Sequence, residues 1–265
     1  MSISLEKTPA RLLGLGVAAL TVPALAQDAD ALLRDADRYR TGADNLQVDT
    51  LVRAYASDGT LDKERRYTVF AQSDRRTLVL MQSTAEQGQK VLMLGDDFWL
   101  LMPSSQRPLR ITPMQKLLGD ASTGDIATMR WSGDYSATLV GVEPCVDALV
   151  PTGTAPSTKA PPPASCYHLQ LQATRKGVTY QRIELWLGQQ RHEPVRAQLY
   201  VQSDKLAKQA LFEVDPSLSS VSAMVLIDQL GKQKQTRIRY LARKERTVPV
   251  EWLNPMFLAR SPVLE

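Results

Sequence analysis

The feature that most constrains the fold is an alternation of apolar and polar residues, repeated in short segments along most of the chain. In residues 166–174, for example, Leu169 and Leu171 fall on one face, while Gln170 and Gln172 fall on the other. This period of two is typical of a β-strand with one buried face. Segments of this kind cover residues 48–57, 65–73, 76–83, 90–96, 97–103, 134–144, 166–174, 180–188, 194–202, 205–214, 222–230 and 236–244.

The connections between these segments are mostly short and carry turn residues such as Asp-Gly and Gly-Asp-Asp. Parallel strands need crossovers of a dozen or more residues, so the strands must be antiparallel. We therefore expect a mainly β fold with about eleven antiparallel strands. A twisted sheet of that size curls, and its concave side must be filled by side chains, by helices or by a ligand.

Two inserted pieces have helical spacing. Residues 29–39 place Leu32, Leu33 and Ala36 on one face, which predicts an amphipathic helix. A second helical patch is predicted at Met114–Leu118 and Thr123–Trp131, with Thr123 as its N-cap. The last residues, 251–260, are expected to be a short helical terminal piece.

The hairpin at residues 91–102 is apolar on both faces of its strands, whereas a sheet with one wet face would alternate there. Met93 and Met102 lie in it, and flexible methionine suits a cavity that adapts to its contents as well as a core gap. Alternation places Phe98, Leu100 and Met102 on one face of the second strand. The apolar excess therefore indicates either a packed core or a pocket for an apolar guest.

The first 26 residues have the pattern of a secretory signal peptide. A basic start is followed by an uncharged run from Leu12 to Leu25, and Ala24-Leu25-Ala26 provides a cleavage site. We expect cleavage after Ala26 and one mature domain over residues 27–265. The net charge of +4 is spread evenly, without the clusters that nucleic-acid binding requires.

Two cysteines in an exported chain predict one disulfide, Cys145–Cys166. They bracket a Pro-rich loop at residues 146–165, which cannot build a core. The sequence offers no catalytic constellation: neither His168 nor His192 has metal-ligand spacing to a partner, and no nucleophile elbow or phosphate loop is present. We expect neither an enzyme nor a cofactor or metal.

The run from Asp97, Phe98 and Trp99 through Pro103 to Arg110, followed by Asp125 and the Asp134-Tyr135 strand, resembles the outer-membrane lipoprotein-sorting-protein-like family, relatives of LolA and LolB. The resemblance extends over roughly residues 30–250.

This resemblance implies a half-open antiparallel β-barrel whose concave apolar face is covered by helices and binds acyl chains. The expected cavity residues are Met93, Phe98, Leu100, Met102, Met114 and Leu118, and the helical pieces at 29–39 and 114–131 are the expected lid. The implied function is a periplasmic carrier of a lipid or lipidated protein, with an inner-membrane hydrophobe exporter as a further partner. A lipid-sensing regulatory module and a structural module without a ligand remain alternatives.

Overall fold

The structure is a computed structural model, and it describes residues 28–105, 107–119, 121–145, 163–231 and 234–260. The predicted signal peptide and residues 146–162 of the predicted Pro-rich loop lie outside the described residues.

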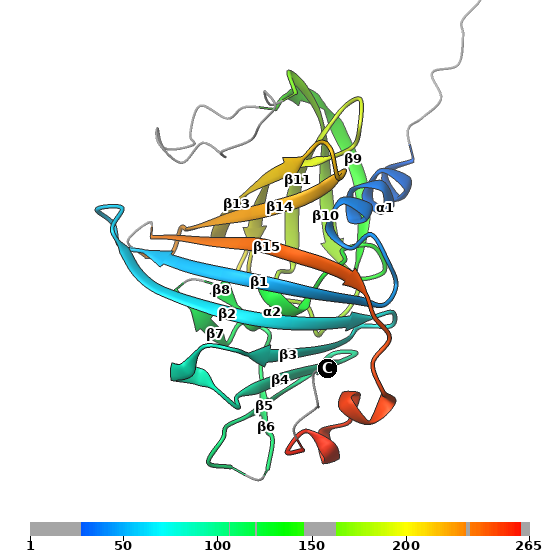
Figure 1. The fold of residues 1–265 in the computed structure, drawn as a ribbon. Helices are drawn as coiled ribbons and strands as arrows, with labels where there is room; N and C mark the ends of the chain where they lie inside the picture. Colours follow the sequence, from blue (N-terminus) through cyan, green and yellow to red (C-terminus); the bar gives the residue numbers. More distant parts are fainter. Residues whose placement is uncertain (1–27, 106, 120, 146–162, 232–233, 261–265) are drawn as a thin grey trace, which may run out of the picture.

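One antiparallel sheet of 13 strands forms the body of the domain, in the order β6-β5-β4-β3-β2-β1-β15-β14-β13-β12-β11-β10-β9. Its edge strands β6 and β9 do not pair with each other, so the sheet is a half-open barrel, as expected (Figure 1). The strands are β1 (Leu46–Tyr55), β2 (Leu61–Gln72), β3 (Arg76–Met81), β4 (Lys90–Leu94), β5 (Asp97–Leu101), β6 (Leu109–Ile111), β9 (Tyr135–Pro144), β10 (Ser165–Ala173), β11 (Arg182–Gly188), β12 (Pro194–Tyr200), β13 (Leu206–Asp215), β14 (Ser220–Asp228) and β15 (Gln235–Glu245).

The strands that the sequence did not predict are short. Strand β6 has three residues, and β7 (Lys116–Leu118) and β8 (Ala121–Ser122) form a separate two-stranded hairpin. The prediction of a helix at Met114–Leu118 is therefore wrong. Met114, Leu117 and Leu118 have helical spacing, but Gly119, with φ 55°, turns the chain back at once.

Two α-helices lie on the concave side of the sheet. Helix α1 (Ala29–Arg40) packs against β9 and β14, and helix α2 (Thr123–Ala127) packs against β2 and β3 (Figure 1). Helix α2 is shorter than the predicted segment, and its N-cap is Ser122 instead of Thr123. Short 3-10 helices occur at η1 (Thr84–Glu86), η2 (Val250–Leu253) and η3 (Pro255–Phe257).

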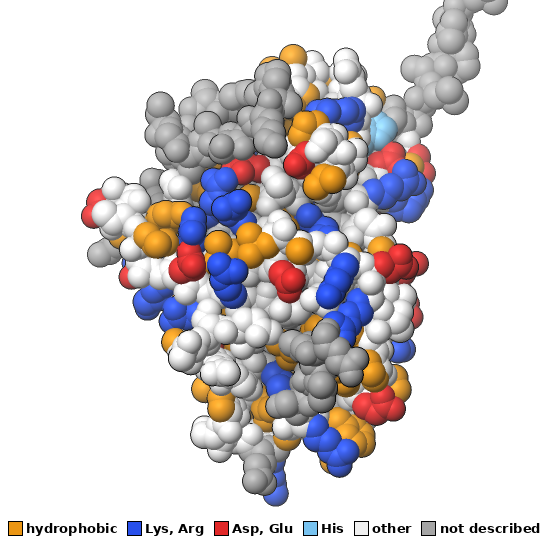
Figure 2. Space-filling model, viewed as in Figure 1, with side chains coloured by type: hydrophobic (Ala, Val, Ile, Leu, Met, Phe, Trp, Pro, Cys, Tyr) orange, Lys and Arg blue, Asp and Glu red, His pale blue; other side chains and the backbone are white. Residues whose placement is uncertain are grey.

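The main core lies between the concave face and the two α-helices, and smaller clusters lie on the outer face. On the face seen in Figure 2, basic, acidic and hydrophobic side chains are interspersed, in keeping with the evenly spread charge of the sequence. In the described part of the chain, no helix has the length and apolarity needed to span a membrane.

Candidate functional site

Helix α1 covers the concave face because its apolar stripe points into the barrel. Its N-cap is Asp28, whose side chain accepts a hydrogen bond from the Asp30 N–H at 3.0 Å, which orients the first turn. The buried face consists of Leu32, Leu33, Ala36, Asp37 and Arg40. Thus the helix brings two charged side chains, as well as an apolar stripe, into the interior.

Asp37 attaches α1 to the loop that leads into β9. Its carboxylate accepts hydrogen bonds from the Trp131 N–H at 2.9 Å, the Ser132 N–H at 2.7 Å and the Ser132 hydroxyl at 2.7 Å. Burial raises the pKa of Asp37, and the charge of Arg40 and the hydrogen bonds to Ser132 and Trp131 offset that rise in part.

Arg40 makes a second attachment to the same loop. Its Nη2 donates to the Thr128 carbonyl at 3.1 Å, and its guanidinium carbon lies 3.8 Å from the centroid of the Trp131 ring. We refer to the contacts of Asp37 and Arg40 with residues 128–132 as the α1 latch.

Helix α2 is attached to the barrel wall around Tyr180 and Lys208 by one carboxylate, that of Asp125. Asp125 forms a capping box with Ser122, accepts a hydrogen bond from the Tyr180 hydroxyl at 2.8 Å, and pairs with the Lys208 ammonium at 2.5 Å. Both members of the ion pair are almost completely buried. A Cβ at Gly124 would lie 1.8 Å from the Thr179 hydroxyl oxygen, so α2 approaches the wall this closely only with glycine there.

Two cavities lie on either side of the loop that the α1 latch holds. The inner cavity, about 40 Å³, lies inside the barrel; the mouth cavity, about 290 Å³, lies at the end of α1. Thr128 lines both. The inner cavity is bounded by Arg40 and largely by apolar or aromatic side chains, among them Trp131, Tyr135, Ile183, Leu199, Phe212 and Met224.

The mouth cavity has an apolar floor and a charged rim. Leu46, Ala71, Met93 and Met129 form the floor. The rim carries the ion pairs Arg75–Asp134, Arg130–Asp44 (2.7 Å) and, at its border, Arg175–Asp96 (3.0 Å). Burial raises the pKa of Asp134, and the charge of Arg75 offsets part of this rise.

The predicted cavity residues are only partly brought together. Met93, Phe98 and Leu118 are buried in the main core, and Leu100 packs against it. Met93 lines the mouth cavity. Met102 is half-buried, and Met114 is 37% exposed.

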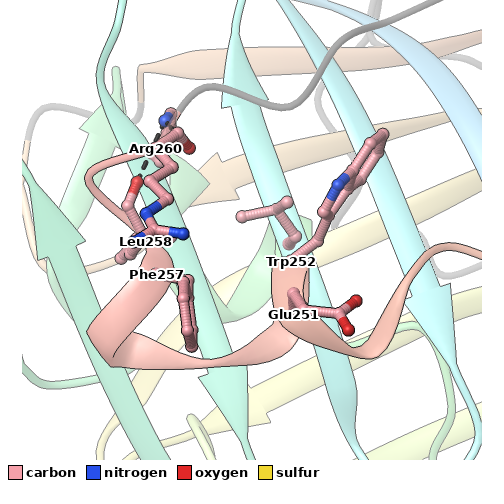
Figure 3. Close-up of a pocket in the computed structure, with 7 residues that line it drawn as sticks. Glu251, Trp252, Phe257, Leu258 and Arg260 are labelled. Atoms are coloured by element: carbon pink, nitrogen blue, oxygen red, sulfur yellow. Dashed lines mark hydrogen bonds between the residues drawn. The ribbon is translucent and has the colours of Figure 1, made fainter.

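The apolar excess of the hairpin formed by β4 and β5 has a second source on the outer face. Trp99 and Leu101 point away from the barrel interior and pack with Leu92 under the C-terminal segment, which contributes Trp252 and Leu258. Between this segment and the sheet lies a cavity of about 180 Å³, where the Lys90 ammonium donates to the carbonyls of Leu258 and Arg260 at 2.9 Å (Figure 3).

The predicted disulfide Cys145–Cys166 is present and packs against Trp186 on the outer face. Beside it, His168 lies within 2.8 Å of a carboxylate oxygen on each side, from Glu143 and Glu184. Sequence spacing could not show this contact, because the two glutamates come from the neighbouring strands β9 and β11. In the described part of the chain, no cluster of His, Cys, Asp and Glu has the arrangement of a metal site.

The latch residues were missed at the sequence level. The predicted helix at residues 29–39 was assigned a buried face of apolar residues alone. Arg40 lies four residues after Ala36 and seven after Leu33, so it falls on the same stripe. That spacing was the one sign in the sequence that Arg40 faces the interior. The partners Trp131 and Ser132 are more than 90 residues away, and no local pattern indicates them.

Comparison with known proteins agrees with this fold. A family model described as that of an uncharacterized protein matches residues 73–260. A LolA superfamily protein from Nitrosomonas europaea is 29% identical, with a TM-score of 0.74 over 86% of this chain and 98% of that one. None of the curated proteins in the comparison matches the chain.

Two more distant structures share the fold. A putative outer membrane lipoprotein-sorting protein domain from Vibrio parahaemolyticus is 15% identical, with a TM-score of 0.63 over 88% of this chain and 98% of that one. A DUF1329 family protein from Desulfovibrio piger is 17% identical, with a TM-score of 0.65 over 86% and 98% of the two chains.

Proposed function

This chain belongs to the outer-membrane lipoprotein-sorting-protein-like family, the LolA/LolB-like group, and on that premise we propose that it is a periplasmic carrier of acyl chains. The cargo is a lipid or a lipidated protein, and its acyl chains occupy the half-barrel. The periplasm is the proposed compartment, and the signal peptide expected at residues 1–26 supports it.

The observation that carries the proposal is the pair of cavities separated by one latched loop. Ligand pockets measure about 300–1,000 Å³, so the inner cavity of about 40 Å³ is too small for an acyl chain in this structure. The mouth cavity of about 290 Å³ approaches that size. Release of residues 128–132 from Asp37 and Arg40 would join the two spaces and open an apolar path into the barrel.

The free energy gained by burying an acyl chain is comparable with the free energy needed to open the α1 latch. Transfer of an acyl chain out of water is favourable by about 0.8 kcal/mol per methylene, or about 8 kcal/mol for ten. Opening the α1 latch breaks hydrogen bonds from Trp131 and Ser132 to Asp37 and from Arg40 to Thr128, and hydrogen bonds to charged groups contribute about 1.5–3 kcal/mol each. Insertion of a chain can therefore offset the opening of the α1 latch, and withdrawal of the chain closes it again.

In this proposal the wall of the opened site begins at Met93, on the floor of the mouth cavity. It continues along the same face of the hairpin through Phe98 and Leu100 and reaches Leu118. Delivery to this mouth by an inner-membrane hydrophobe exporter would fit a cargo that is a free lipid.

A matched pair of variants tests the proposal. Leu199 lines the inner cavity, whereas Leu211 belongs to an outer-face cluster, and each is 5% exposed. Asparagine at either position buries an unpartnered amide, at a cost of about 1–3 kcal/mol. We expect both Leu199→Asn and Leu211→Asn to lower the thermal midpoint, but only Leu199→Asn to weaken uptake of a fluorescent fatty acid.

If the parent protein takes up no probe, the barrel is a filled structural module and the carrier proposal is wrong. Equal loss of uptake in the two variants would likewise contradict a binding site inside the barrel.

A further inference from the structure

A bulge in the sheet places an arginine inside the barrel. Along β15, Tyr240 pairs with Thr50 of β1, but Ala242 pairs with Asp49, so β15 carries one extra residue at this point. Arg243 then stands opposite Val48, a fully buried residue of the main core. The irregularity thus brings Arg243 to the concave face, beside Tyr240, and its guanidinium carbon lies 4.6 Å from the centroid of the Tyr240 ring.

Three buried polar atoms on this part of the concave side have no hydrogen-bond partner among the described residues. They are Arg40 Nη1, Arg243 Nε and the Thr50 hydroxyl oxygen. The nearest carboxylate oxygen to Arg40 Nη1 belongs to the ion-paired Asp37, at 3.7 Å, which is too long for a hydrogen bond. Leaving such groups unpaired costs about 1–3 kcal/mol each, so three together need an explanation.

The charges of the same region are unbalanced. Asp125 is paired with Lys208, and the Asp37 carboxylate accepts hydrogen bonds from Trp131 and Ser132. In the described part of the chain, no carboxylate forms an ion pair with Arg243. Arg243 Nη2 donates to the Val221 carbonyl of β14 at 2.5 Å, and helix α1, which ends at Arg40, packs against the same strand. Burial lowers the pKa of Arg243, the charge of Tyr240 offsets part of that change, and the charge of Arg40 lowers the pKa further.

We propose that Arg40, Arg243 and Thr50 form a binding site for the anionic head group of an acyl-chain ligand. This inference rests on the proposed function: the acyl chain lies in the apolar interior, and its acidic end meets the two guanidinium groups. A guanidinium group can donate two parallel hydrogen bonds to two oxygens of a carboxylate or a phosphate, and the Thr50 hydroxyl supplies one more donor. The ligand neutralises the excess buried positive charge.

The site would make the carrier bind acidic amphiphiles more tightly than neutral ones. Arg40 also belongs to the α1 latch, through the Thr128 carbonyl and the Trp131 ring. A head group bound to Arg40 therefore lies directly below the loop between the two cavities. An acidic amphiphile satisfies the buried donors, whereas a neutral ester of the same chain length leaves them unpaired.

The test compares three amphiphiles with the same saturated chain: myristate, tetradecyl phosphate and the methyl ester of myristic acid. Each displaces a fluorescent fatty acid from the parent protein and from Arg243→Gln, Thr50→Val and Arg239→Gln. Arg239 is exposed on the same strand and serves as the control. Thr50→Val removes an unpartnered hydroxyl, so this variant should keep or raise the thermal midpoint.

We expect the parent to bind at least one of the two anions about tenfold more tightly than the ester, equivalent to about 1.4 kcal/mol. Arg243→Gln should bring that ratio to within about twofold without changing the ester's affinity, Thr50→Val should lower it, and Arg239→Gln should preserve it. Whether myristate or the phosphate binds more tightly then identifies the head group.

Equal binding of all three amphiphiles by the parent, or a ratio that survives Arg243→Gln, would overturn the head-group site while leaving the carrier function in place. If none of them displaces the probe and the probe itself does not bind, both proposals are wrong.

Discussion

Replacing Asp37 by alanine tests the α1 latch, on which opening of the barrel depends. The substitution removes the acceptor for the N–H groups of Trp131 and Ser132 and for the Ser132 hydroxyl. It also removes the carboxylate that pairs with the buried guanidinium of Arg40 at 3.7 Å. Removing one member of a buried pair costs about 3–5 kcal/mol, since it leaves the other member uncompensated.

The loss should be concentrated at the latch. A cost of about 3 kcal/mol corresponds to a change of about a hundredfold in the local opening equilibrium. We therefore expect the amide protons of Trp131 and Ser132 to exchange about a hundredfold faster in Asp37→Ala, measured by hydrogen exchange. The thermal midpoint should fall by on the order of 10 °C for a domain of this size.

The control is Arg34→Ala, on the same helix. Arg34 pairs with Asp28 at 3.4 Å, and both side chains are exposed, so its loss should cost at most about 1 kcal/mol. The latch interpretation is wrong if Asp37→Ala and Arg34→Ala behave alike, or if exchange at Trp131 and Ser132 is unchanged in Asp37→Ala.

Three further predictions follow from the same geometry. Burial raises the pKa of Asp37 above 3.8, so the folded state binds the carboxyl proton more tightly than the unfolded state does. This contribution to stability is lost as the pH rises above about 4. In urea titrations, Asp37→Asn should therefore gain stability relative to the parent as the pH rises, and a stability difference that does not change with pH would contradict the raised pKa. Serine at both Cys145 and Cys166 should lower the free energy of unfolding by about 3 kcal/mol and leave fatty-acid uptake intact, because the bridge lies on the outer face and closes a loop of sequence separation 21. Leu100→Asn should weaken uptake more than Leu101→Asn, since Leu100 packs toward the interior and Leu101 toward the C-terminal segment; parallel loss of stability without any difference in uptake would place both residues in packed core.

The long strands could be predicted from sequence because each carries its own alternation. The two faces of β5 were also assigned correctly, with Phe98 and Leu100 directed inward and Trp99 and Leu101 outward. The segment that covers the outer face of β5 was not predictable, because the residues that pack on Trp99 lie about 150 positions later in the chain.

The polar residues of the site were predictable only in part. The resemblance included Asp125, but its ion pair with Lys208 joins residues 83 positions apart and becomes visible only in the fold. Arg243 was hidden for a different reason: strict alternation along β15 would place it on the face opposite Tyr240, and the bulge at Asp49 and Thr50 reverses that assignment. A period of two in the sequence cannot show where a bulge shifts the register between two strands, and this bulge is what brings Arg243 to the proposed site.

The central claim is that the barrel holds acyl chains, and the most direct measurement is native mass spectrometry of the protein purified without detergent. We predict a population of the protein with one bound lipid, whose mass identifies an acidic head group and which is lost on denaturation. The denatured sample also gives the mass of the chain, expected to begin at Gln27. Detection of lipid-free protein alone, from a sample that also takes up no added fatty acid, would contradict the account.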